Sequence, residues 1–299
     1  MTAPFEPSRQ ARILAMLLAS IFDFRPALAE SQARGEQQNV QQDVTSNQDV
    51  DESNRTNVGS DITRPQNAVE LRFLDETSTN ATSQTNTALT LLQINSNIPL
   101  VTGWRVGLLT QIPAKEITTT TFDPSSVSHE LGLGDVVFQG FIAHDLNERW
   151  ALGLGARLVA RTAENDLGTG KWQIMPGFGV RYSLLEWGED CYFVPVVRYA
   201  MSFAGDPTAR RISEPQIALT LNIGLPGPWY VTFYPSNDIR INFGQPRSGQ
   251  TGRLFLPFDA LVGAKVTDQM QISLEASVPV VKAYPVYDFK TELRVRVLF

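Results

Sequence analysis

Hydrophobic and polar residues alternate over long stretches of the chain. Residues 171–183 read KWQIMPGFGVRYS. Every second position from Trp172 to Tyr182 is apolar or amphipathic, whereas the positions between them are mostly small, polar or cationic. A period of two is typical of a β-strand whose two faces meet different surroundings. In a soluble sandwich the apolar face packs on a core, but in a membrane barrel it faces lipid and the polar face lines a wet lumen.

The same alternation recurs from residue 67 to the C-terminus and predicts twelve strands, with no helical periodicity between them. The predicted strands span residues 67–74, 87–98, 104–112, 135–144, 150–160, 171–183, 191–203, 214–224, 229–235, 253–266, 269–280 and 287–299. Short turns follow the even-numbered strands, and longer connections such as 75–86 and 113–134 follow most odd-numbered strands. The connection over 281–286 is shorter than this rule predicts. We therefore expect an all-β fold, an antiparallel transmembrane β-barrel of about twelve strands with short periplasmic turns and longer extracellular loops.

Aromatic residues stand at the ends of several predicted strands. Trp104, Trp150 and Trp229 each occupy the first position of a strand that follows a short turn. Such rings form a girdle at the membrane interface of barrels, so we expect outer-membrane lipid as their partner. The chain ends in Phe299, which closes an alternating strand and resembles the C-terminal signal of outer-membrane proteins. Phe299 is therefore assigned to the membrane interface, and the last strand to recognition by the barrel-assembly machinery.

The N-terminal part of the chain differs in composition from the rest. Arg9 and Arg12 precede an apolar run over 13–22, and Ala27-Leu28-Ala29 supplies a small-x-small cleavage site. This pattern predicts a signal peptide over 1–29, because the apolar run is shorter than the ~20 residues of a membrane span. Residues 30–66 are rich in Gln, Asn, Asp and Ser and predict a disordered periplasmic segment. The barrel then takes up 67–299 and lies in the bacterial outer membrane; a secreted soluble β-sandwich is the competing class.

Composition excludes several kinds of site. The chain of 299 residues carries 25 Lys and Arg against 31 Asp and Glu, and this acidic balance argues against nucleic-acid binding. Cys191 is the only cysteine, so neither an intrachain disulfide nor a cysteine metal cluster can form within one chain. No spacing of potential ligands indicates a metal site, and no cofactor is expected.

Three short motifs indicate a family. GLGD at 132–135, LGTGKW at 167–172 with a proline at 176, and SFAGD at 202–206 occur in this order. With these motifs, the region from about residue 86 to the C-terminus resembles the outer-membrane transporters assigned to the MetA pathway of phenol degradation. The resemblance implies an outer-membrane barrel that acts as a transporter or narrow channel for small solutes. Aromatic or hydrophobic compounds and small anions both stay open as solutes, and a non-transporting structural barrel is the alternative.

The two histidines do not form the pattern of a barrel enzyme. Lipid-modifying outer-membrane enzymes carry a His-x-Ser arrangement, whereas His129 is followed by Glu-Leu and His144 by Asp-Leu. The glycine pairs at 132–134 and 153–155 precede no helix, so they do not predict a phosphate-binding loop. We therefore expect no enzymatic activity and assign no catalytic residue.

The predicted inner face of the barrel carries more cations than anions. The inward cations are Arg72, Arg105, Arg157, Arg161, Lys171, Arg181, Arg198, Arg253, Lys265, Lys290, Arg294 and Arg296, and the inward acids are Glu70, Asp135, Asp259, Glu275, Asp288 and Glu292. Twelve strands fall between filled barrels of about eight and aqueous channels of about 16–18, which predicts a narrow passage. Basic residues in such a passage favour anions. We assign solute contact to Arg157, Arg181 and Arg198 on three consecutive strands, with Arg105 and Lys171; the alternative is that these charges pair across the lumen and fill it.

Overall fold

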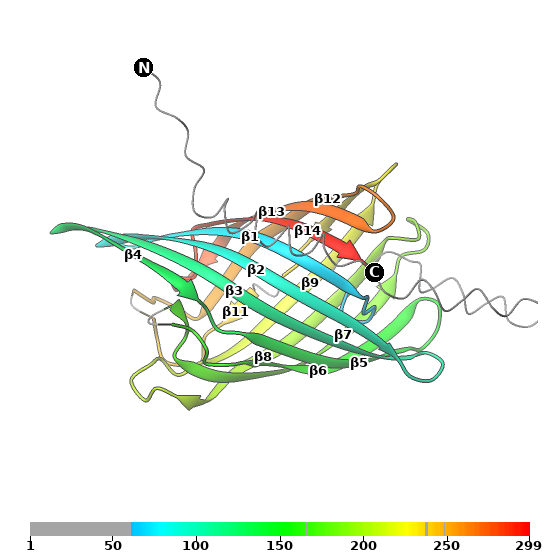
Figure 1. Ribbon diagram of the computed structural model, residues 1–299, viewed down its shortest axis with the longest axis horizontal. Coiled ribbons are helices and arrows are strands. Elements are labelled where there is room, and N and C mark those ends of the chain that lie inside the picture. The colour runs from blue at the N-terminus through cyan, green and yellow to red at the C-terminus, as the bar shows by residue number, and fades with distance from the viewer. Residues whose placement is uncertain (1–60, 165–166, 237–238, 248) are drawn as a thin grey trace, which may run out of the picture. The chain divides into compact units, whose positions relative to one another are not determined.

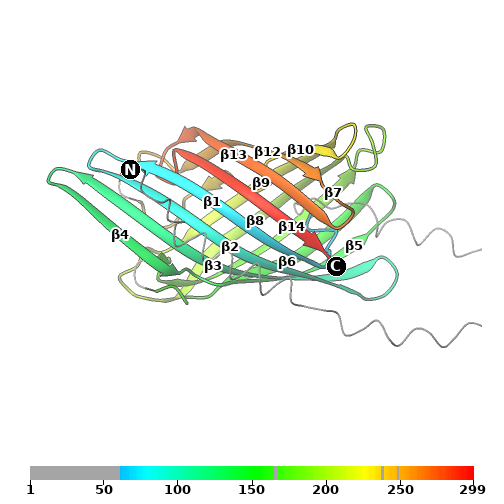
Figure 2. The same cartoon turned by 45° about the horizontal axis from the view of Figure 1, so that its top comes forward.

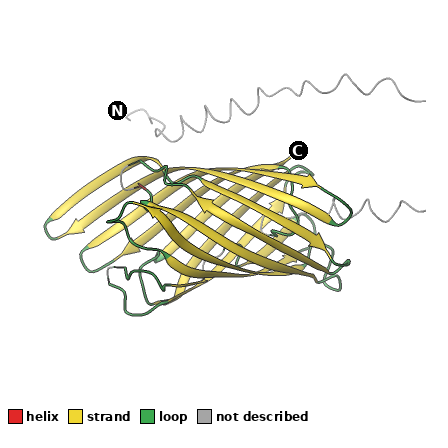
Figure 3. Ribbon diagram, turned by 90° about the horizontal axis from the view of Figure 1, so that it is seen from below, coloured by secondary structure: helices red, strands yellow, loops and turns green. Residues whose placement is uncertain are grey.

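The computed structural model describes residues 61–164, 167–236, 239–247 and 249–299, and these residues form one antiparallel sheet of fourteen strands (Figure 1). Within those ranges no helix is long and apolar enough to cross a membrane, and Figure 3 shows strands joined by loops. The predicted signal peptide and residues 30–60 lie outside the described residues. The strands are β1 (Ala68–Thr79), β2 (Ser83–Pro99), β3 (Trp104–Phe122), β4 (Ser125–Leu133), β5 (Val137–Asp145), β6 (Trp150–Val159), β7 (Lys171–Ser183), β8 (Tyr192–Gly205), β9 (Ser213–Gly224), β10 (Trp229–Phe233), β11 (Ile239–Ile241), β12 (Leu254–Lys265), β13 (Met270–Lys282) and β14 (Phe289–Leu298).

The sheet closes on itself. β1 pairs with β14 from Ala68↔Leu298 to Thr77↔Phe289, and Figure 2 shows the blue first strand beside the red last one. β10 and β11 both lie between β9 and β12, so they are two pieces of one barrel strand. β4 pairs only with the outer part of β3 and adds no strand to the wall. The predicted antiparallel barrel of twelve strands is thus confirmed.

Two connections predicted as long loops are strand hairpins instead. β1 and β2 continue to Thr79 and Ser83, and β3 runs on to Phe122 before it turns back into β4. Figure 1 shows the β3–β4 hairpin projecting past the neighbouring strands. These extensions are rich in Thr and Ser, as in the ITTTTF end of β3, and β-branched threonine favours extended backbone. They lack alternation because both of their faces are polar, so periodicity alone could not reveal them.

The faces of the strands follow the alternation read from the sequence. On β7, Gln173, Met175 and Arg181 are buried, whereas Ile174 and Phe178 are exposed on the outside. Large apolar side chains are exposed in the same way on the outer face of most wall strands, for example Leu154 on β6 and Leu274 on β13. This arrangement inverts a soluble protein, which hides its apolar residues and wets its polar ones.

Glycine at position 155 allows β5 and β6 to approach closely. A Cβ atom added there would lie 2.3 Å from the Gly140 carbonyl oxygen and 2.5 Å from Phe141 Cβ. Gly155→Ala should therefore force the two strands apart and destabilise the barrel by about 1–3 kcal/mol, as overpacking does. Gly140→Ala is the matched control, because its Cβ would meet only Leu108 Cδ2 at 3.6 Å. Urea titration of both variants in detergent measures the difference; equal midpoints would contradict the close approach.

Candidate functional site

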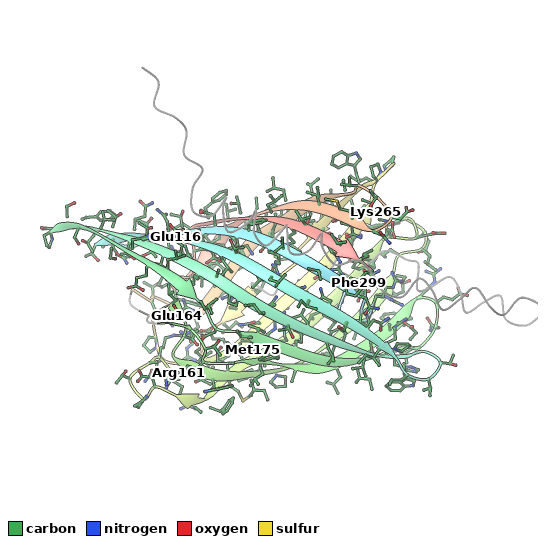
Figure 4. All side chains as sticks on the ribbon, in the orientation of Figure 1. Glu116, Arg161, Glu164, Met175, Lys265 and Phe299 are labelled. Carbon is green, nitrogen blue, oxygen red and sulfur yellow. The ribbon has the colours of Figure 1, made fainter. Side chains whose placement is uncertain are left out.

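The two ends of the barrel differ in their connections. At one end lie both termini of the closed sheet and the turns 100–103, 146–149, 184–191, 225–228 and 266–269; we call it the turn end. The opposite end carries the β3–β4 hairpin and residues 160–164, 167–170, 206–212, 242–247, 249–253 and 283–288, and we call it the loop end. Figure 4 places Lys265 and Phe299 toward the turn end, and Glu116, Arg161 and Glu164 toward the loop end.

Residues 61–66, which the sequence analysis assigned to the polar segment, lie inside the barrel at the turn end. We call them the plug segment. Thr63 is fully buried, and Ile62 packs against the inward-facing cluster of Tyr192, Val194, Val196, Tyr230 and Leu261. Gly153 and Gly179 leave room for this approach, since a Cβ at Gly179 would lie 2.9 Å from Ile62 Cδ1. An apolar anchor of this kind offsets part of the entropy lost when a polar segment becomes ordered.

Charged residues of the wall hold the plug segment in place. Arg181, which is fully buried, forms ion pairs with Asp61 at 3.7 Å and with Asp145 at 3.1 Å. Arg105 also pairs with Asp145, and its Nη2 donates to the Thr63 carbonyl oxygen at 3.3 Å. Within the plug, the Asp61 carboxylate accepts from the Thr63 backbone N–H at 2.8 Å. These contacts tie three strands to the plug and narrow the lumen at the turn end.

A cavity of about 370 Å³ occupies the lumen on the loop-end side of the plug segment. Ile62 of the plug contributes to its lining, and Arg157, Arg198 and Arg240 stand along one side of it. Arg157 Nε donates to Gln139 Oε1 at 3.0 Å, so this guanidinium is held in place by a neutral neighbour rather than by a carboxylate. The arrangement can concentrate anions, because basic side chains inside a narrow, low-dielectric passage act at short range.

The opposite part of the wall is an ion-pair network on β1, β13 and β14. Arg72 binds Glu292 through two hydrogen bonds of 2.6 and 2.8 Å, and Lys290 Nζ lies 2.7 Å from Glu275. Further pairs join Arg294 to Glu275 and to Glu292, and Arg296 to Glu70 at 3.2 Å. Charges therefore pair across neighbouring strands on this side, as the filling alternative expected.

The structure separates the five residues to which solute contact was assigned. Arg157 and Arg198 line the cavity together. Arg181 and Arg105 lie at the turn end, where they hold the plug segment, so the expected single wall of Arg157, Arg181 and Arg198 does not form. Lys171 lies at the loop end and donates to the Asp206 carbonyl oxygen. Alternation decides which face a side chain occupies, but the strand tilt and the stagger between strands decide its height in the barrel.

Several residues predicted to point into the lumen belong to the loop end instead. Arg161, with 46% of its side chain exposed, pairs with Asp206 at 4.0 Å. Asp135 accepts hydrogen bonds from the Thr169 and Ala163 N–H groups and organises the 160–170 connection. Arg253 lies over the Phe243 ring, and Asp288 pairs with Lys282. The predicted strands ran one or two residues too far at Asp135, Arg253 and Asp288, whereas Arg161 lies just beyond both the predicted strand over 150–160 and β6. Arg240 was missed for the opposite reason, because the short β11 has too few residues to show a period.

The aromatic residues assigned to the membrane interface all lie at the turn end. Trp104, Trp150 and Trp229 begin β3, β6 and β10, and each is exposed on the outer face. Trp104 stacks on His144 with ring centroids 4.2 Å apart, and Phe299 is 72% exposed beyond β14. Trp187 in the 184–191 turn adds another exposed ring at the same end. Their interfacial role stays a prediction.

The described ranges contain no group of three His, Cys, Asp or Glu residues that could hold a metal ion. Cys191 is buried near the 184–191 turn, where its Sγ accepts from the Gly224 N–H at 3.3 Å. His144 bonds the Gly103 carbonyl oxygen, and His129 lies 3.3 Å from Thr118 Oγ1. Each of these groups has a structural contact that accounts for its position.

The model of a protein family described as "Putative MetA-pathway of phenol degradation" matches residues 25–280. Among solved structures, the chain is similar to the KdgM porin, with 7% identity, 78% of this chain and 99% of that chain covered, and a TM-score of 0.40. It is similar to the NanC porin, with 11% identity, coverage of 77% and 98%, and a TM-score of 0.45. It is also similar to the beta domain of the Bordetella autotransporter BrkA, with 12% identity, 79% of this chain and 100% of that chain covered, and a TM-score of 0.47. No curated protein sequence matches the chain.

Proposed function

Because the chain belongs to the family described as the MetA pathway of phenol degradation, we propose that it is an outer-membrane barrel that passes small solutes through its lumen. The apolar outer face and the exposed tryptophans at the turn end suit a barrel in lipid. The turn end then faces the periplasm and the loop end faces the exterior. The N-terminal export pattern and the terminal Phe299 support the same placement, with the barrel-assembly machinery acting on β14.

The observation that carries this proposal is the polar cavity enclosed by the wall. A barrel that served only as a membrane scaffold would have no need of a cavity of about 370 Å³ with arginines along one side. The plug segment and the ion-pair network make the passage narrow, which suits selected small solutes rather than general diffusion. Arg157 and Arg198 favour anions in such a passage.

Replacing the two cavity arginines should change ion selectivity. We expect the reconstituted barrel to show a small conductance that prefers chloride over potassium, and Arg157→Gln with Arg198→Gln to remove most of that preference. The reversal potential across a planar bilayer under a KCl gradient measures it. Arg161→Gln is the matched control, because it removes the same charge from the loop end outside the cavity. A cation-selective pore, or selectivity unchanged in the double variant, would contradict the assignment.

The second candidate is a barrel without transport activity, and the narrowing of the turn end by the plug segment favours it. Arg181, Asp61 and Asp145 hold the plug segment through buried ion pairs, which suits a lumen that stays shut. This candidate predicts no conductance and no solute uptake in proteoliposomes, even when the plug segment has been removed. Neither candidate is an enzyme, so lipase and deacylase assays in mixed micelles should give no turnover.

A further inference from the structure

The cavity has an apolar side as well as a basic one. Leu74, Leu89, Leu91 and Leu109 point inward from β1, β2 and β3 and line the cavity. Leu74 and Leu89 are direct cross-strand partners, and Leu91 is buried in the lumen. Inward positions of membrane barrels are usually polar because the lumen is wet. Leu74, Leu89 and Leu91 are neighbours across β1 and β2, and leucines at such positions indicate a surface that an apolar body can cover.

Glutamines stand beside the arginines on the basic side of the cavity. The strand pairing places Gln139 opposite Arg157 between β5 and β6. It then places Gln216 beside both Arg198 on β8 and Arg240 on β11. The carboxylates of the cavity lining, Glu70, Glu76 and Glu292, stand on β1 and β14 instead. Positive charge is thus concentrated on one arc of the wall, where Gln139 and Gln216 stand beside the arginines.

The strand order sets these two surfaces against each other. Going round the barrel from β2, one reaches β8 after β3, β5, β6 and β7 in one direction, and after β1, β14, β13, β12, β11 and β9 in the other. β2, with Leu89 and Leu91, and β8, with Arg198, therefore lie on nearly opposite sides of the lumen. A ligand that spans the cavity would meet Leu89 and Leu91 at one end and Arg198 at the other.

Resting on the proposed function, we infer that this cavity is a binding site for an amphipathic organic monoanion, a carboxylate on an apolar body. The carboxylate would accept charge-assisted hydrogen bonds from Arg157 and Arg198, and the apolar body would cover the leucines. A small inorganic anion leaves the leucines in water, and a neutral hydrophobe removes water from the guanidinium groups without replacing its hydrogen bonds. A cavity of about 370 Å³ accommodates such a ligand.

Equilibrium dialysis of the full chain in detergent tests the inference, with hexanoate as the probe and protein-free micelles as the blank. Hexanoate should bind about tenfold or more tightly than acetate, because its additional methylene groups are buried against the leucines. Hexylammonium, which has the same body and the opposite charge, should not bind above the blank. Equal retention of hexanoate and acetate, or of hexanoate and hexylammonium, would overturn the inference.

Substitutions on the basic side and on the apolar side test the contribution of each to hexanoate affinity. Arg157→Gln with Arg198→Gln should abolish hexanoate binding, whereas Arg161→Gln should leave it unchanged. Leu89→Asn should bring hexanoate affinity down toward that of acetate, and Leu109→Asn provides a second test on a neighbouring strand. Heat-modifiable migration on gels verifies that each variant still forms a closed barrel. Unchanged hexanoate affinity in the arginine double variant, or in both folded leucine variants, would contradict the assignment.

Binding in micelles and conduction in bilayers separate this inference from the proposed function. If ions pass but hexanoate and acetate bind alike, the channel function stands and the amphipathic site is wrong. If hexanoate binds selectively but no solute passes, the site stands and the passage is wrong.

Discussion

Deletion of residues 30–66 is expected to raise the single-channel conductance of the barrel several-fold. The plug segment fills the lumen at the turn end, where Ile62 packs on Tyr192 and Tyr230 and Thr63 is buried. The wall should survive the deletion, because Arg181 keeps its 3.1 Å ion pair with Asp145 when Asp61 is lost. Planar-bilayer recordings of the shortened and full chains, both checked for heat-modifiable migration, measure the change.

A disulfide that fixes the plug segment to the wall complements the deletion, because it tests whether the plug segment limits the conductance while it stays in the chain. A Cβ at Gly153 would lie 3.4 Å from Thr63 Cγ2, so Thr63→Cys with Gly153→Cys places two thiols close together. The oxidised protein should keep the low conductance of the full chain. Reduction should break the link between the plug segment and the wall, so that the plug segment can move out of the lumen. Either single cysteine variant is the control for the oxidant. If the deletion leaves conductance unchanged, the wall side chains rather than the plug segment form the constriction.

The second large effect concerns stability. Glu275→Gln should destabilise the barrel by about 3 kcal/mol or more, as the loss of one partner from a buried ion pair does. Glu275 is fully buried on β13 and pairs with both Lys290 and Arg294, so the substitution leaves two cations facing one neutral amide. Arg72 and Arg296 lie in the same network and add to the repulsion. Urea unfolding of the detergent-solubilised protein, followed by tryptophan fluorescence, measures the shift.

Glu186→Gln is the matched control for this prediction. Glu186 lies in the exposed 184–191 turn, where a hydrogen bond from Arg149 lowers the pKa of its carboxyl group. An exposed pair of this kind contributes little because water and salt screen it, so we expect no measurable change in unfolding. The double variant Glu275→Gln with Lys290→Met should recover part of the loss, since it removes one of the two cations that faced Glu275. Equal stability of Glu275→Gln and the wild-type chain would show that water reaches this part of the wall.

The alternation of apolar and polar residues along the chain predicts where each wall strand lies and which of its residues face the lumen. On β7 and β13, successive residues lie about 3.3 Å apart along the strand and point to opposite faces, so alternate residues share a face. An apolar face and a polar face are therefore a local property that each segment carries by itself. For this reason the positions of Gln173, Met175 and Arg181 on the inner face follow from the order of residues alone.

A local sequence pattern is not enough to predict the polar hairpins or the partners of the charged residues. The extensions of β1, β2 and β3 have two polar faces, so their strand pairing leaves no alternation to read. The ion pair between Arg72 and Glu292 joins residues at opposite ends of the sequence, and it forms because closure brings β1 against β14. Sequence reasoning supplied the charged residues of this wall but not their partners.

The order of residues by itself determined the twelve wall strands and their inner and outer faces. Only the tertiary structure decided which arginines share the cavity and which ones hold the plug segment. Arg157 and Arg181 have the same facing on neighbouring strands, but the stagger between β6 and β7 places one at the cavity and the other at the turn end. Likewise, residues 61–66 enter the lumen because Ile62 and Asp61 find complementary partners there, and those partners come together only when the barrel closes.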